Sequence, residues 1–217
     1  MAYKEHVKIL EAGIQVWNQW RDSDPAISPD LSRLNFINKN FAGINLSKCD
    51  LRQCVFNEAD LRQANFQKAY LHSASFIKSD LRDTNFSQAD LTMVKFIDAV
   101  LEGCMFSNAV LNEVDFSNRI MKQFNFSGAN LYRAKFKNSD LTKSDFRQAY
   151  LGEADLFMAN LSQVDLRGAN LSGANLSNAF LKDALLEGAI ITNANFNGAF
   201  LSPRQKISIW FPFIPIR

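Results

Sequence analysis

The side chains best suited to chemistry in this chain are three cysteines, two histidines and many aspartates. Cys49, Cys54 and Cys104 are residue types that bind metals, form disulfides or act as nucleophiles. Their number is odd and no pair has CxxC spacing, which argues against both a disulfide framework and a zinc site. His6 and His72 lie far apart in the sequence, and neither has a partner that would orient it for catalysis. We therefore predict no catalytic residue, no metal site and no cofactor.

The aspartates follow a rule that concerns the backbone. Most of them occupy one position of a five-residue repeat, which they share with asparagine, as in "ADL" and "ANF". A position that accepts Asp and Asn alike requires a short polar side chain and not a charge. Such side chains bond to nearby backbone and are typical of turns. We expect the aspartates to hold turns together, and we expect the protein not to be an enzyme.

A large apolar residue recurs at every fifth position. From Leu31 to Leu201 there are 35 such positions, all occupied by Leu, Phe, Met or Ile. Two residues before each, from Ala59 to Ala199, 19 of 29 positions hold Ala and most others hold small residues. Neither a helix nor a strand has a period of five. The pattern favours a solenoid whose chain turns a corner every five residues, with one large and one small side chain pointing inward on each side.

The type of the large residue indicates how many sides each coil has. Phe and Leu alternate from Phe56 to Leu151, with Met121 in the place of one Leu. A coil of four pentapeptides would sort them into columns of Phe on two opposite walls and columns of Leu on the other two. A three-sided coil would mix Phe and Leu on every wall. The sequence therefore predicts an all-β solenoid of nearly nine four-sided coils.

The segments "AGINL", "GANLSGANL" and "QADL" resemble the motif of the pentapeptide-repeat family, A(D/N)LxX. The resemblance covers residues 31–202, which is most of the chain. It implies a right-handed quadrilateral β-helix, whereas the spacing alone gives four sides and no handedness. The segment "WNQWRDSDPAISPDL" is also similar to the leader of many bacterial, notably cyanobacterial, members, which indicates a prokaryotic source.

The two ends of a solenoid require caps because they expose backbone edges and an apolar interior. We expect residues 1–30 to form an N-terminal cap with an amphipathic helix over 5–20, and residues 31–202 to form the β-helix. One face of that helix would carry Val7, Leu10, Ile14 and Trp17. Residues 203–217 leave the repeat with the apolar run "KISIWFPFIPIR". We expect this tail to cap the last coil or fold back over it; the alternative is a homodimer contact.

Apolar residues replace the usual outward polar ones in two regions, and exposed apolar patches can mark interfaces. The candidate partner-binding residues are Ile77, Ile97, Val100, Met105, Val110 and Ile120. The candidate C-terminal cap or dimer contacts are Phe180, Leu185, Phe200, Trp210, Phe211 and Phe213. Separately, Arg119 and Phe124 stand where Ala is expected, which predicts a bulge or an altered corner.

Charge and hydropathy restrict the classes of partner. A net charge of +2 gives no reason to expect direct binding of nucleic acid. The N-terminal segment lacks the apolar run of a secretory signal, and no segment approaches the roughly 18 apolar residues of a membrane span. We therefore expect a cytoplasmic protein that does not bind membranes.

We interpret the chain as a non-catalytic structural or interaction protein that presents rigid β-helix faces to an unidentified protein partner. The family resemblance implies an alternative, a DNA mimic that binds a type II topoisomerase (DNA gyrase) and protects it from quinolones or toxins. That role requires a negatively charged surface. Here basic residues offset the acidic ones: Arg52, Arg62, Arg82, Lys122, Arg147 and Arg167.

Overall fold

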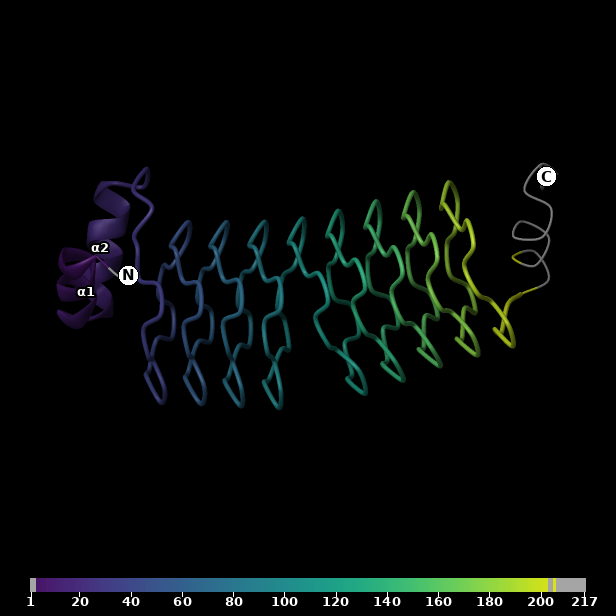
Figure 1. The fold of residues 1–217 in the computed structure, drawn as a ribbon, viewed down its shortest axis with the longest axis horizontal. Helices are drawn as coiled ribbons and strands as arrows, with labels where there is room; N and C mark the ends of the chain where they lie inside the picture. Colours follow the sequence, from purple (N-terminus) through teal and green to yellow (C-terminus); the bar gives the residue numbers. More distant parts are fainter. Residues whose placement is uncertain (1–2, 203–204, 206–217) are drawn as a thin grey trace. The chain divides into compact units, whose positions relative to one another are not determined.

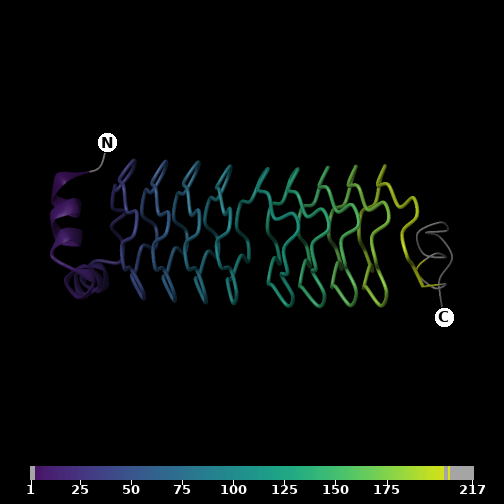
Figure 2. The ribbon, with the colours of Figure 1, turned by 90° about the horizontal axis from the view of Figure 1, so that it is seen from below.

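The computed structural model describes residues 3–202 and 205, and the chain divides into two compact units, Met1–Val114 and Asp115–Arg217. Each unit consists of stacked four-sided laps (Figures 1 and 2). In both units a side pairs with the same side of the next lap through one parallel bridge, as in Asp60↔Asp80 and Asp140↔Asn160. Within the described residues these β-elements are single bridges and no strand is longer. Paired residues are thus four pentapeptides apart, which confirms the predicted four sides.

The interior of each unit is filled by columns of phenylalanine rings. Phe56 stacks on Phe76 with ring centroids 5.0 Å apart and planes 4° apart, and Phe66 stacks on Phe86 at 5.1 Å. The two columns meet edge to face across the axis, since Phe56 and Phe66 lie 5.7 Å apart at 85°. The second unit has two such columns of its own, Phe116 on Phe136 and Phe126 on Phe146. The predicted Phe columns on opposite walls are therefore present in each unit.

Each repeat has five backbone N–H groups. In the repeat 61–65 all five have an acceptor within the fold. The N–H groups of Leu61, Gln63 and Asn65 donate to carbonyls of neighbouring laps. The Ala64 N–H closes the turn on the Leu61 carbonyl at 3.0 Å. The fifth, that of Arg62, donates to Oδ1 of Asp60 at 3.2 Å. Four donors are thus satisfied by backbone and one by a side chain.

This side-chain acceptor recurs throughout the described laps. All 21 Asp and Asn residues at that position accept the N–H two residues on, at 2.9–3.2 Å. A hydrogen bond of this kind contributes about 0.5–1.5 kcal/mol. The expectation that the aspartates hold turns together is confirmed.

Each corner also places one residue in the left-handed region. From Arg33 to Gly198, 34 corner residues have φ between 55° and 73°, and 27 of them are not glycine. With a hydrogen bond between the first and fourth residues and positive φ at the third, the corners have the form of type II turns. None of these corner residues is Val, Ile, Thr or Pro. β-branched side chains are the ones that tolerate this conformation least.

Two helices precede the laps in the first unit, α1 (Lys4–Glu11) and α2 (Ile14–Ser23). The sequence predicted one helix over 5–20, and that prediction is wrong because the chain breaks at Gly13, whose φ is 112°. A residue with a side chain rarely adopts that conformation, whereas glycine does so at little cost. No helix in the described part of the chain has the length and apolar character needed to cross a bilayer.

α2 supplies hydrogen bonds to the open edge of the first lap. Trp17 is fully buried and its Nε1 donates to the Asn45 carbonyl at 2.7 Å. The buried guanidinium of Arg21 donates to the carbonyls of Ile27 and Ser47, both at 2.8 Å. The carbonyls of Asn45 and Ser47 have no preceding lap to bond, so Trp17 and Arg21 act as a cap, and the bond to Ile27 holds the segment that leads into the laps.

The unusual residues Arg119 and Phe124 do not produce a bulge. The bridges Ile120↔Asp140 and Asn125↔Asp145 keep the spacing of one lap, and Phe124 is buried. The corner itself is altered: the Phe124 N–H donates to Ser144 Oγ at 3.1 Å, and that hydroxyl donates to the Met121 carbonyl at 2.8 Å. A hydroxyl from the next lap thus links the two ends of the turn.

Truncating one ring of a Phe column should destabilise its unit. Phe76 is fully buried between Phe56 at 5.0 Å and Phe96 at 5.6 Å. Phe76→Ala should lower the free energy of urea unfolding by about 3–5 kcal/mol. Tyr70→Ala, which removes an exposed ring in the same unit, should change it by about 0.5 kcal/mol or less. Equal stabilities of the two variants would contradict the inward placement.

A β-branched residue should be tolerated at the second residue of a corner, such as Gln67, but not at the third, such as Lys68. Lys68 has φ of 60°, whereas Gln67 lies outside the left-handed region. Lys68→Val should destabilise by about 1–3 kcal/mol because of backbone strain. Gln67→Val should cost about 0.5 kcal/mol or less, and Lys68→Gly should behave more like Gln67→Val than like Lys68→Val. Thermal and urea unfolding measure all three, and similar losses for both valine variants would show that the conformation of Lys68 carries no strain.

Candidate functional site

The three cysteines lie inside the solenoid as small filling residues. All three are buried, and the thiols of Cys54 and Cys104 donate to the carbonyls of Leu31 and Leu81, both at 3.1 Å. Burial raises the pKa of Cys49 and that of Cys54 to about 12. Thiols in that range are almost wholly protonated at neutral pH and are poor nucleophiles and metal ligands. Within the described residues no three His, Cys, Asp or Glu side chains are grouped to hold a metal ion.

The histidines also have structural positions. His6 Nδ1 accepts the Asp30 N–H at 3.1 Å, which ties α1 to the start of the laps. Its ring lies 5.4 Å from that of Trp20. His72 is a half-buried corner residue whose carbonyl accepts the Gln53 N–H at 3.0 Å. The structure does not bring the two histidines together.

Several aspartates pair with an arginine two residues later. In the first unit Arg62 contacts Asp60 at 2.6 Å and reaches Asp80 of the next lap at 3.8 Å. Hydrogen bonds from arginine side chains hold the pKa of Asp60 and that of Asp80 below the usual range. The second unit has a matching ladder, in which Arg147 contacts Asp145 at 2.6 Å and Asp165 at 3.8 Å. Each of these carboxylates is paired with a guanidinium, so the two ladders do not form a strongly negative surface.

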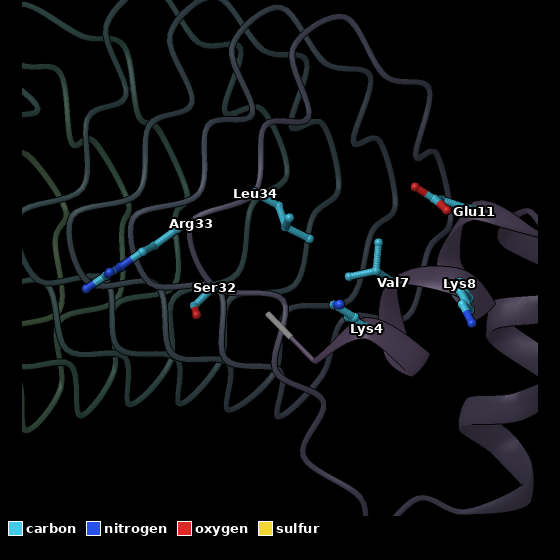
Figure 3. Close-up of a pocket in the computed structure, with 7 residues that line it drawn as sticks. All are labelled: Lys4, Val7, Lys8, Glu11, Ser32, Arg33 and Leu34. Atoms are coloured by element: carbon cyan, nitrogen blue, oxygen red, sulfur yellow. The ribbon is translucent and has the colours of Figure 1, made fainter. Parts of the chain in front are cut away.

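A pocket of about 540 Å³ lies between α1 and the first corner of the laps (Figure 3). Val7 and Leu34 provide its apolar surface, and both are half-buried. Charged residues surround it, but Figure 3 shows Arg33 extending away from α1. Its charged groups do not converge on one point, which a specific polar ligand would require.

An apolar patch lies in the first unit at one corner and the wall that follows it. Ile97 and Val100 are 57% and 45% exposed, and Ile77 is half-buried in the preceding lap. The Lys78 N–H donates to the Ile97 carbonyl at 2.9 Å, which places the corners of Ile77 and Ile97 side by side. We call Ile77, Ile97 and Val100 the Ile97–Val100 patch. It is the part of the predicted partner-binding set that the structure brings together.

The remaining members of that set lie elsewhere. Exposed Met105 and half-buried Val110 project from the next two walls of the lap that holds Val100. A flat partner surface cannot contact three walls of a four-sided coil at once. Ile120 belongs to the second unit, where it is 78% exposed.

A second apolar group lies in the last laps of the second unit. Phe180 and Phe200 share one wall and stack at 4.6 Å with planes 3° apart, as expected for residues one lap apart. Leu185 is exposed on the next wall. The other predicted contacts, Trp210, Phe211 and Phe213, lie outside the described residues.

One residue at this end was not foreseen from the sequence. Gln205 is buried, and its Nε2 donates to the carbonyls of Leu181 at 2.7 Å and Ala184 at 2.8 Å. Its Oε1 accepts the Ser202 N–H at 2.7 Å. Gln205 therefore supplies to the last laps the kind of bonds that Arg21 supplies to the first.

The family of the chain follows from comparison of its sequence with known families. A model described as "Pentapeptide repeat region" matches residues 29–99 and 69–146, and one described as "Pentapeptide repeats (8 copies)" matches 134–173, 144–183 and 169–202. The chain belongs to the pentapeptide-repeat family. No curated protein matches the sequence.

The chain is similar to several solved pentapeptide-repeat proteins, and it shares its fold with one of them, HetL. HetL, involved in heterocyst differentiation regulation in the cyanobacterium Nostoc sp. strain PCC 7120, is 25% identical with a TM-score of 0.70, over 84% of this chain and 93% of HetL. Full-length QnrB1, a plasmid-mediated fluoroquinolone resistance protein, is 18% identical with a TM-score of 0.38, over 85% of this chain and 100% of QnrB1. A thylakoid-lumen protein of Arabidopsis thaliana is 32% identical over 48% of this chain and 75% of that one, with a TM-score of 0.24.

The buried thiols should be inert in the folded pentapeptide-repeat protein. With pKa values of about 12 for Cys49 and Cys54, roughly one thiol in ten thousand is ionised at pH 8. Iodoacetamide at pH 8 should therefore add no label in the native state and three labels in urea, as counted by mass spectrometry. Gln67→Cys, which places a thiol at a half-buried outward corner position, should add one label within minutes. Rapid labelling of native wild-type protein would contradict the inward placement.

Proposed function

We propose that this pentapeptide-repeat protein is a non-catalytic interaction protein, and that the Ile97–Val100 patch on its first unit binds another protein. The walls would be those of a right-handed coil, as the family resemblance implies. The likeness to HetL, a protein involved in regulation of differentiation, is compatible with a role exerted through contacts with other proteins.

The observation that carries the proposal is the residue at position 100. In the laps before it, Asp60 and Asp80 occupy the same column and accept the N–H groups of Arg62 and Arg82. Valine has no acceptor for the corresponding N–H, so the substitution gives up a bond worth about 1 kcal/mol. It also places an apolar side chain in water. A residue that breaks the local rule without benefit to the fold is best explained by a contact outside it.

The surroundings of the patch favour a protein surface as the partner. The wall that holds Val100 also carries the Asp60–Arg62 and Asp80–Arg82 pairs in the preceding laps, and these pairs are close to neutral as a group. Apolar centres with a polar rim are typical of protein interfaces. Nucleic acid would instead require unpaired cations facing the phosphates.

Restoring the repeat residue tests the patch without disturbing the fold. Ile97→Asn combined with Val100→Asn should fold normally, because Asn at 100 regains the turn acceptor. Affinity capture from the native cell followed by mass spectrometry should show a protein that wild type retains and this variant loses at least about tenfold, equivalent to 1.4 kcal/mol.

The matched control is Ile37→Asn, because Ile37 is exposed at the same repeat position as Ile97, three laps away. This variant should retain the partner. Equal capture by wild type, the double variant and the control would contradict a role for the patch. Once a partner is captured, its binding to each of the three purified proteins measures the effect directly.

Binding to a type II topoisomerase as a DNA mimic stays a prediction. The paired Asp and Arg residues weaken the case for it, because a mimic of duplex DNA requires rows of unpaired negative charge. A gyrase supercoiling assay with this protein at micromolar concentration, with and without a quinolone, distinguishes the two functions.

A further inference from the structure

Outward aromatic side chains gather where the repeat ends. Bridges place Asp140, Asn160, Phe180 and Phe200 in one column of the second unit. The first two accept a turn N–H, whereas the two phenylalanines cannot. Their parallel rings are 42% and 57% exposed and form a flat apolar platform. As at Val100, the fold itself does not require these residues, so a contact is needed to explain them.

A depression of about 310 Å³ adjoins the platform. Met158 and Phe180 form its apolar sides, and Asn160 and Ser162 contribute polar groups. The volume accommodates one large aromatic side chain. A buried tryptophan is the residue type that combines such a ring with an N–H in need of a polar partner.

A segment of the chain itself could occupy the depression, because it starts close to the platform. Gln205 is bonded to the carbonyl of Leu181, the residue directly after Phe180, so the chain is anchored beside the platform. Twelve residues follow, 206–217, and seven of them are Ile, Trp or Phe. Twelve extended residues reach up to about 40 Å, whereas the two laps from Phe200 to Asn160 rise only about 10 Å. The segment is therefore long enough to cover the wall.

We propose that residues 206–217 pack on the Phe180–Phe200 wall of their own chain, with Trp210 in the depression beside Phe180. A tethered segment has an effective concentration in the range of about 1 mM. At micromolar protein concentrations, the same segment of a second copy is present at a far lower concentration than the tethered one, so the contact within one chain is favoured. The inference concerns the second unit, so it stands or fails separately from the Ile97–Val100 patch.

Trypsin cleavage after Lys206 tests the proposal in the full chain. Packing of the segment should protect the peptide bond after Lys206, and the rate of cleavage should be proportional to the fraction of molecules in which the segment is unpacked. Phe180→Asn restores the repeat residue, whose Oδ1 can accept the Lys182 N–H, and should accelerate cleavage about tenfold or more. Trp210→Ser should do the same without any change to the described laps. Ile120→Asn, an exposed residue at the same repeat position and in the same unit, should cleave at the wild-type rate.

Two results would overturn the proposal. One is equal cleavage of wild type and both test variants, with unchanged thermal unfolding of each. The other is protection that grows with protein concentration together with a dimer in light scattering, which would assign the wall to a second copy. Concentration-independent protection that both variants abolish supports it.

Discussion

A chain that turns every five residues presents five backbone donors in each repeat, and the fold supplies acceptors for most of them. Stacking on neighbouring laps satisfies three of them, and the corner hydrogen bond satisfies a fourth. The fifth, as on Arg62, points outward at the corner and is met by the side chain of Asp60. This single requirement explains why a short polar acceptor recurs on every wall. The aspartates, numerous enough to invite a search for acid catalysis, are part of the backbone framework.

The same requirement distinguishes structural residues from functional ones. Inward positions are determined by volume, and outward bridge positions by the need for an acceptor. A residue such as Val100 or Phe180 satisfies neither condition, because it gives up a hydrogen bond and exposes apolar area to water. Residues 3–202 and 205 form no cleft lined by reactive groups, so these departures are the most informative features of the described surface.

The sequence predicted the four-sided laps, the Phe columns and the turn-holding aspartates because each depends on residues at fixed spacing. It did not reveal the left-handed corner residues, since Lys, Gln, Glu, Asn and Met all occupy them. The sequence signals at that position are the lack of β-branched residues and the presence of seven of the nine glycines of the chain. The break at Gly13 was missed because the apolar spacing of the helices continues across it, and Gln205 was missed because it lies beyond the repeat. Of the predicted interaction residues, spacing identified the outward ones and placed Phe180 and Phe200 on one wall, but it did not show how exposed each side chain is.

Within each unit, every outward bridge residue pairs with its counterpart one lap on, as Asp60 does with Asp80, and this has a consequence for how such chains can change length. Duplication or loss of a whole lap leaves every later side chain on its original wall. Insertion of a single pentapeptide instead rotates all that follows by a quarter revolution and brings phenylalanines above leucines inside the coil. Within one unit, evolution can therefore move a surface feature along the axis in steps of one lap at little cost, but it cannot easily move that feature around the axis.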